Sequence, residues 1–206
     1  MFRHIALATA LLLGSLSVSG CASTNRGNPN PSQADQYGLA GGSNKTTSFE
    51  EKDLVQAIST HLGVTSESAA SAIERIFRER GRPVAYITGE EGGGALTIGA
   101  RYGKGTLWMK DGRQQRVFWQ GPTIGFDAGA DASKVFTLVY GLDNPEDIFR
   151  RFPGVDGSAY LVAGMAVNYQ RANGITLAPV RSGVGLRLGA NVGYTSFTRK
   201  RSLIPL

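Results

Sequence analysis

Apolar residues recur at helical spacing at the start of the part of the chain that can bury a core. Three of them lie four residues apart: Leu54, Ile58 and Leu62. This spacing puts them on one face of a helix, and Gly63 is typical of the residue that ends one. The pattern therefore predicts an amphipathic helix that begins at a capping box formed by Ser48 and Glu51 and ends at Gly63.

A second amphipathic helix is predicted to begin near Thr65 or Ser66 and to end at Gly81. Its buried face is expected to consist of Ala69, Ile73, Ile76 and Phe77. Four arginines lie on or just after this helix, at positions 75, 78, 80 and 82. Cations near a helix C-terminus favour the helix dipole, so these arginines indicate a solvated outer face more than an anionic partner.

From residue 83 the spacing of apolar residues changes from helical to alternating. Turns that contain glycine separate short β-rich segments, which predicts strands at 83–89, 95–103, 105–110, 115–120, 123–129, 133–141, 157–171, 175–181 and 184–199. One short helix fits 144–149. The expected fold is mainly β: a small antiparallel barrel of about 8–10 strands, with two N-terminal helices and one short inserted helix. A sandwich is the alternative, and a barrel is favoured because closure removes sheet edges.

Two predicted strands carry an arginine between glycines on the face opposite their apolar residues. These arginines are Arg101 and Arg187, and Asn191 lies on the same face as Arg187. Glycine within a strand often marks the close approach of a ligand or another backbone. One interpretation is a shallow groove in which these three residues bind an anionic group such as a lipid phosphate. The other is that glycines let the barrel bend while the arginines pair with acids such as Asp127.

The N-terminus has the order of a secretory signal: a cation at Arg3, an apolar run from 5 to 13, and then small residues. The run is shorter than the roughly 20 residues that a helix needs to span a bilayer. Residues 18–21, Val-Ser-Gly-Cys, resemble the lipobox of bacterial lipoproteins, and Cys21 is the chain's one cysteine. An ordinary cleaved signal followed by a stray cysteine is the alternative.

The lipobox interpretation divides the chain into three parts. Residues 1–20 are the signal peptide, and Cys21 becomes the lipidated first residue, carrying acyl chains such as palmitate. Residues 21–47, rich in Asn, Gly, Ser and Pro, form a flexible tether, and 48–206 form the folded domain. Several acyl chains give stable anchoring. Ala22, rather than aspartate, follows the cysteine, which favours the periplasmic, inner leaflet of the outer membrane.

Composition and charge narrow the range of partners. Without the signal the chain keeps 21 basic and 16 acidic residues, a net charge of +5. A modest positive charge suits an anionic envelope surface, such as anionic lipid, lipopolysaccharide or peptidoglycan. No zinc finger or RNA-binding signature is present in the sequence, so nucleic acid is not an expected partner.

The sequence offers no set of residues typical of catalysis or metal binding. After the signal, His61 is the single histidine, and no free thiol remains beside the lipidated Cys21. The glycines of 183–189 lack both the Rossmann spacing and a following helix. No nucleophile elbow occurs. We therefore expect no enzyme activity, no metal and no cofactor.

Four segments carry a resemblance to a known family: EEGGGALTIGARYGKGTLWMK (90–110), WQGPTIGFDAGADASKVFTLVYGL (119–142), RRFPGVDGSAYLVAG (150–164) and LAPVRSGVGLRLGANVGYTSFTRK (177–200). Together they resemble the EipA (envelope integrity protein A) family from about residue 48 to the end. The resemblance implies a small periplasmic β-barrel with accessory helices, a part in envelope integrity and stress resistance, and no established enzyme activity. Relatives usually look freely periplasmic, whereas this chain has Cys21 in a lipobox.

Residues 121–125 and the glycine-rich final strands also resemble SYLF lipid-binding domains, which agrees with an anionic groove. The favoured function is thus a lipid-anchored periplasmic binding or structural protein that supports the envelope. One alternative is an integral outer-membrane barrel, although only 157–171 and 184–199 reach the length that its strands need. A second alternative is a hydrolase that acts on the cell wall.

Overall fold

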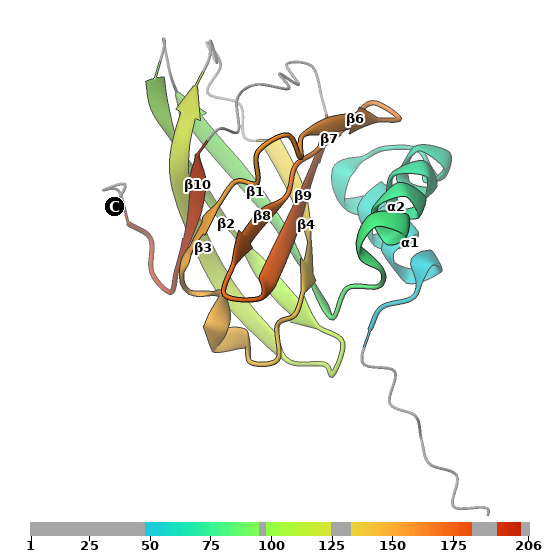
Figure 1. Ribbon diagram of the computed structural model, residues 1–206, viewed down its shortest axis with the longest axis horizontal. Coiled ribbons are helices and arrows are strands. Elements are labelled where there is room, and N and C mark those ends of the chain that lie inside the picture. The colour runs from blue at the N-terminus through green and yellow to red at the C-terminus, as the bar shows by residue number, and fades with distance from the viewer. Residues whose placement is uncertain (1–47, 95–97, 125–132, 183–192, 203–206) are drawn as a thin grey trace, which may run out of the picture. The chain divides into compact units, whose positions relative to one another are not determined.

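The structure is a computed structural model that describes residues 48–94, 98–124, 133–182 and 193–202 (Figure 1). Two α-helices come first, α1 (Glu51–Leu62) and α2 (Ser66–Arg80), and a 3-10 helix, η2 (Pro145–Ile148), follows β4. The described part contains ten strands: β1 (Ala85–Gly94), β2 (Ile98–Met109), β3 (Gln114–Ile124), β4 (Ser133–Tyr140), β5 (Arg151–Pro153), β6 (Tyr160–Val162), β7 (Met165–Val167), β8 (Gln170–Ala172), β9 (Ile175–Ser182) and β10 (Tyr194–Thr198).

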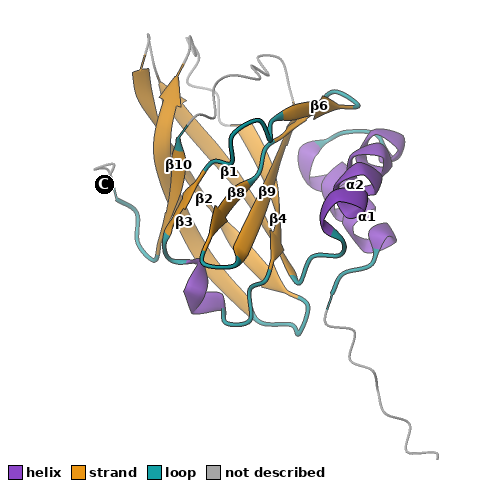
Figure 2. Ribbon diagram, viewed as in Figure 1, coloured by secondary structure: helices purple, strands orange, loops and turns teal. Residues whose placement is uncertain are grey.

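The strands form one antiparallel sheet that curls around itself (Figure 2). Its order is β5-β10-β3-β2-β1-β4-β9-β7-β6, and β8 also pairs with β9. A single bridge between Gly154 and Gln170 joins the end of β5 to β8, and so brings the two sides of the sheet together. The predicted mainly β, antiparallel barrel with two helices is confirmed, and the short inserted helix is η2.

The curled sheet separates two hydrophobic cores. Side chains that alternate along the strands fill the barrel interior, among them Ile87, Leu107, Val117, Leu177 and Phe197. The outer face of β4, β9 and β7 forms a second core with the helices, and Figure 1 shows α1 and α2 against this side of the barrel. The helices thus cover one wall of the barrel.

Sequence periodicity identified both helices and their buried faces. Leu54, Ile58 and Leu62 are buried, as are Ala69, Ile73 and Ile76. The predicted capping box is wrong, because the residue that precedes α1 is Glu50 and no side chain caps that end. For α2 the prediction is confirmed: the Thr65 hydroxyl accepts a hydrogen bond from the Ser68 amide at 3.2 Å.

Two side chains fasten the helices to the barrel. The Tyr169 hydroxyl, on the segment between β7 and β8, donates to Glu79 Oε2 of α2 at 2.6 Å and lies 3.2 Å from the Tyr160 hydroxyl. Near the end of α1, His61 Nε2 lies 3.0 Å from the Gly89 carbonyl oxygen and 3.1 Å from that of Val135. His61 is partly exposed, and its ring bonds to β1 and β4.

The strand predictions were wrong in several places. β5 was not predicted, and β3 continues through Gly121 and Pro122, where a break between 115–120 and 123–129 was predicted. Segments 95–103 and 105–110 belong to one strand, β2, within which Gly105 continues the ladder. The predicted strand 157–171 consists of three short strands. Ala163 and Gly164 have φ of 47° and 77°, which makes a tight turn between β6 and β7. The strand predicted at 184–199 lies outside the described residues except for β10.

The gap between β7 and β8 has a physical cause on the neighbouring strand. Both strands pair with β9 in one continuous register, which runs from Met165 opposite Ser182 to Ala172 opposite Ile175. Continued through the gap, that register puts Pro179 opposite Asn168. Proline has no amide hydrogen for the ladder, so the pairing is interrupted there.

None of the described helices combines the length and the apolar character needed to cross a membrane.

Candidate binding site at one end of the barrel

Charged side chains gather inside the barrel at one of its ends. Glu91 lies toward the end of β1, Arg101 near the start of β2 and Arg181 near the end of β9. Each falls in phase with interior apolar residues of its own strand, because Ile87, Leu107 and Leu177 are an even number of positions away. The strand alternation therefore turns all three into the barrel.

Glu91 is buried and held by three hydrogen bonds. Its Oε1 accepts from Arg181 Nε at 2.6 Å, and its Oε2 accepts from Arg181 Nη2 at 3.4 Å and from Trp119 Nε1 at 3.1 Å. Burial alone would raise the pKa of Glu91. The charges of Arg181 and Arg101, together with these hydrogen bonds, outweigh burial and lower its pKa to about 2. The carboxylate is therefore ionised at any physiological pH.

A second set of bonds holds Arg101 beside this pair. Arg101 Nη2 donates to the Thr195 hydroxyl at 2.7 Å, and Gln170 Nε2 donates to the same oxygen at 2.9 Å. Arg101 is 7% exposed. Burial, and then the nearby charge of Arg181, lower its pKa to about 10 against the opposing effect of Glu91. Arg101 thus stays charged at neutral pH while it lies close to a second guanidinium.

The cluster takes residues from both sides of the curled sheet. Arg181 Nη1 donates to Asn168 Oδ1 at 3.2 Å, which adds the segment between β7 and β8. Thr195 comes from β10 and Gln170 from β8, the strand that reaches β5 through the closing bridge. Gln170 Oε1 is buried and makes no hydrogen bond in the described structure. The same residues therefore form the site and tie the barrel wall together.

The chemistry of this cluster suits binding better than proton transfer. Its carboxylate is locked in the ionised form, and its guanidinium groups donate hydrogen bonds without accepting any. Two arginines and one carboxylate meet there among the described residues, so the arrangement favours an anionic group over a cation. The described residues contain no group of histidine, cysteine or acidic side chains that could hold a metal ion.

The structure describes one of the predicted site residues, Arg101, and corrects its orientation. The sequence placed Arg101 on the face opposite the strand's apolar side, in a shallow groove. Instead it shares the interior face with Leu107 and Met109, and it is buried. The other predicted residues, Arg187, Asn191 and the lipidation site Cys21, lie outside the described residues, as does Asp127.

Sequence reasoning missed Glu91, Trp119 and Arg181. A signal was present for Glu91, because Ala85 and Ile87 set an apolar phase in β1 that continues through Gly89 to position 91. The run Glu90-Glu91 followed by three glycines concealed it, since acids beside glycines look like a turn. The pairing of Glu91 with Arg181 joins residues 90 positions apart and had no local signal.

Comparison with known proteins gave two matches of interest. The model of a family described as envelope integrity protein A matches residues 47–206. A crystal structure of a beta-barrel-like, uncharacterized protein from Brucella abortus is similar, with a TM-score of 0.71 and 40% sequence identity over 78% of this chain and 99% of that chain. No functionally curated protein showed significant similarity.

Proposed function

This chain belongs to the envelope integrity protein A family, and on that premise we propose that it is a lipid-anchored periplasmic protein that supports the bacterial envelope by binding and not by catalysis. The family match over 47–206 carries the proposal, because it connects the whole folded part with the envelope. The signal-like order of residues 1–20 and the resemblance of residues 18–21 to a lipobox support the proposed location.

A binding role rests on the state of the buried groups. Proton transfer needs a group whose pKa lies near the working pH. Glu91, with its pKa lowered to about 2, and Arg101, with its pKa near 10, both lie far from neutrality. These groups can instead hold a charged partner or one another. The function proposed here therefore includes no enzyme activity and no cofactor.

The finer part of the proposal concerns an anionic ligand at the end of the barrel. Guanidinium groups bind phosphate and carboxylate with two parallel hydrogen bonds. Arg101, with Arg187 and Asn191 from the final part of the chain, would contact such a group on an envelope lipid or glycan. The double variant Arg101→Gln/Arg187→Gln should bind anionic phospholipid more weakly than the parent. Its binding of zwitterionic lipid should be unchanged. Loss of folding would mean that both arginines are structural.

The integral outer-membrane barrel is disfavoured by charges on the outside of the barrel. Transmembrane barrels present an apolar band to lipid. Here Glu90, Lys104 and Arg116 are exposed on neighbouring strands, and their positions alternate with those of the interior residues. The domain of residues 44–206 should stay in solution without detergent. A strict need for detergent would restore the membrane-barrel alternative.

A deletion strain tests the envelope role directly. Cells without the protein should become more sensitive to detergent, to cell-wall antibiotics or to salt, and the parent gene should restore resistance. A strain that tolerated all three conditions as its parent does would contradict the proposal. Peptidoglycan digestion by the purified protein would favour the hydrolase instead.

The anchor has its own test. Cys21→Ala should abolish labelling with a fatty-acid analogue and release the protein from the membrane fraction or leave an unprocessed precursor. Cys21→Ser serves as a second variant, because serine keeps a similar size but has no thiol to acylate. Unchanged labelling and fractionation in both would remove the lipid anchor from the proposal while leaving the envelope role open to the deletion test.

A further inference from the structure

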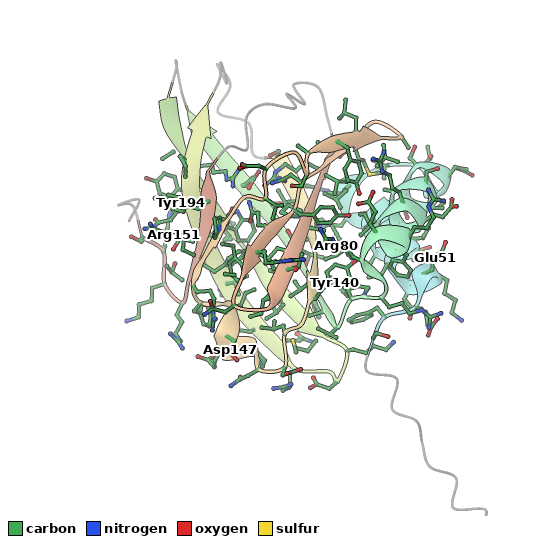
Figure 3. All side chains as sticks on the ribbon, viewed as in Figure 1. Glu51, Arg80, Tyr140, Asp147, Arg151 and Tyr194 are labelled. Atoms are coloured by element: carbon green, nitrogen blue, oxygen red, sulfur yellow. The ribbon has the colours of Figure 1, made fainter. Side chains whose placement is uncertain are left out.

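The wall of the barrel that the helices leave uncovered carries a row of exposed cations and aromatic rings. We define this outer cationic face by five residues on β2, β3, β5 and β10: Lys104, Arg116, Phe118, Arg151 and Tyr194. The strand alternation turns all of them outward, because the odd-numbered Leu107 and Val117 and the adjacent Phe152 and Thr195 are interior. Figure 3 shows Arg151 and Tyr194 on the side of the barrel away from the helix residues Glu51 and Arg80.

The register places these residues side by side. Lys104 is directly opposite Phe118, which is opposite Thr198 on β10. One step along the strands, Ser196 on β10 is opposite Arg151, and Tyr194 is opposite Pro153 on β5. Neighbouring strands lie about 4.8 Å apart, so these four strands span about 14 Å. The three cations therefore lie on the same face of these four strands.

The three cations of this face differ from most arginines of the helical side, because they form no ion pair with an acid among the described residues. Arg75, Arg78 and Arg82 each form an ion pair with a glutamate. Within the part of the chain that the structure describes, no such pair involves Lys104, Arg116 or Arg151, and all three are exposed.

An acid lies at one margin of the face without neutralising it. Glu90 on β1 is the cross-strand neighbour of Lys104, but it is equally the neighbour of Lys134 on β4, so two lysines flank one carboxylate. The face consequently keeps a positive excess.

Both arginines of this face lie over aromatic rings. The Arg151 guanidinium carbon lies 4.1 Å from the centre of the Tyr194 ring, and that of Arg116 lies 5.4 Å from the centre of the Phe118 ring. A guanidinium stacked on a ring keeps its charge, and its N–H groups remain directed outward in the plane. Stacking already restricts these two side chains. Binding a phosphate group therefore costs them less conformational entropy than it would cost a free arginine side chain.

From this arrangement we propose that the outer cationic face docks the barrel onto an anionic phospholipid surface. A broad sheet face with separated cations can contact several headgroups at once, and the half-exposed tyrosine suits the headgroup region. Each cation near an anionic membrane contributes about 1 kcal/mol. An acyl anchor would keep the domain within reach of such a surface, but the docking itself does not depend on it.

The test uses the domain of residues 44–206, which forms one compact unit. The similar Brucella abortus chain is matched over 99% of its length by 78% of this chain. That chain therefore has its fold without counterparts of the remaining residues of this chain. The domain is sedimented with vesicles that contain phosphatidylglycerol and, separately, with vesicles of phosphatidylcholine alone. We expect binding to the first that falls as salt rises, and little binding to the second.

Two triple variants locate the contact. Lys104→Gln/Arg116→Gln/Arg151→Gln should reduce partitioning onto phosphatidylglycerol vesicles by about 100-fold, since three contributions of about 1 kcal/mol are lost. Lys52→Gln/Arg78→Gln/Arg82→Gln removes the same charge from the helical side and should bind as the parent does. Both variants must unfold at the parent's midpoint in urea, and if the first does not, the single variants replace it.

Equal binding by the first triple variant and the parent would overturn the proposal, and so would equal losses in both triple variants. Binding of a soluble anionic polysaccharide without any binding to phosphatidylglycerol vesicles would also overturn it, in favour of a glycan. Both triple variants keep Arg101, so phospholipid binding inside the barrel would persist in the first triple variant. The deletion phenotype tests the envelope role separately, whichever result the vesicles give.

Discussion

The indole ring of Trp119 occupies the space that a side chain at Gly103 would need. A Cβ atom built at position 103 would overlap three atoms of the ring, and one built at Gly89 would overlap another. Gly103 lies directly opposite both Trp119 and Glu91 in the sheet, so it gives the ring room to reach the carboxylate with its N–H group. Glycine within these strands therefore accommodates a side chain of the protein's own interior.

Gly103→Ala should destabilise the fold by about 1–3 kcal/mol, because the added methyl group forces Trp119 out of its position. The free energy of unfolding in urea measures this. The cost should be smaller when Trp119→Leu is already present, since the shorter side chain leaves space. Equal costs in both backgrounds would contradict the steric explanation.

Glu91→Gln should cost about 3–5 kcal/mol, because it leaves the guanidinium of Arg181, whose side chain is 13% exposed, without its counter-charge. The matched control is Glu90→Gln, which changes the exposed neighbour on the opposite face of β1 and should alter stability by less than about 0.5 kcal/mol. Similar effects of the two substitutions would show that Glu91 is less important than its burial indicates.

The same carboxylate predicts a dependence of stability on pH. The pKa of Glu91 is lowered to about 2 from an ordinary value of 4.5, so the unfolded chain binds the proton more readily. The contribution, about 3 kcal/mol, is fully present above pH 4.5 and is lost as the pH falls toward 2. The stability difference between the parent and Glu91→Gln should shrink over this interval. A difference that stayed constant from pH 5 to pH 2.5 would refute the assignment.

Tyr169→Phe should loosen the attachment of α2 at a cost of about 1.5–3 kcal/mol, because it removes a hydrogen bond to an ionised carboxylate. Burial raises the pKa of Tyr169, and the bond to Glu79 raises it further, so the hydroxyl remains a donor. Tyr160→Phe removes only the longer contact between the two hydroxyls and should cost less. Amide exchange in α2, compared between the variants, locates the effect.

His61→Phe should weaken the contact of α1 with the barrel, and His61→Gln should weaken it less. A hydrogen on Nε2 can bond to the carbonyl oxygen of Gly89 or of Val135, and the glutamine amide can replace that donor whereas phenylalanine cannot. We expect a loss of about 1–2 kcal/mol for phenylalanine. Urea midpoints that coincide for the two variants would show that packing alone matters at this position.

Periodicity predicted the helices because their buried faces depend on local spacing. A residue every three or four positions determines which side of a helix is apolar, whatever that side later contacts. The same reasoning found the strands but misjudged their breaks. Pro179 on β9 interrupts the pairing at Asn168 and Tyr169, which separates β7 from β8. The sequence of β7 and β8 alone does not show this break.

The sequence by itself thus determined the helical layer, the mainly β domain and the resemblance to the envelope family, since each depends on local order along the chain. Only the tertiary structure decided which face of each strand turned inward. Arg101 and Leu107 share one face of β2, so the polar-looking face proved to be the interior. The curling of the sheet then brought Glu91 to Arg181 across 90 residues, a pairing that no local pattern encodes. Each charge compensates the other in an interior where either one alone would be costly to bury.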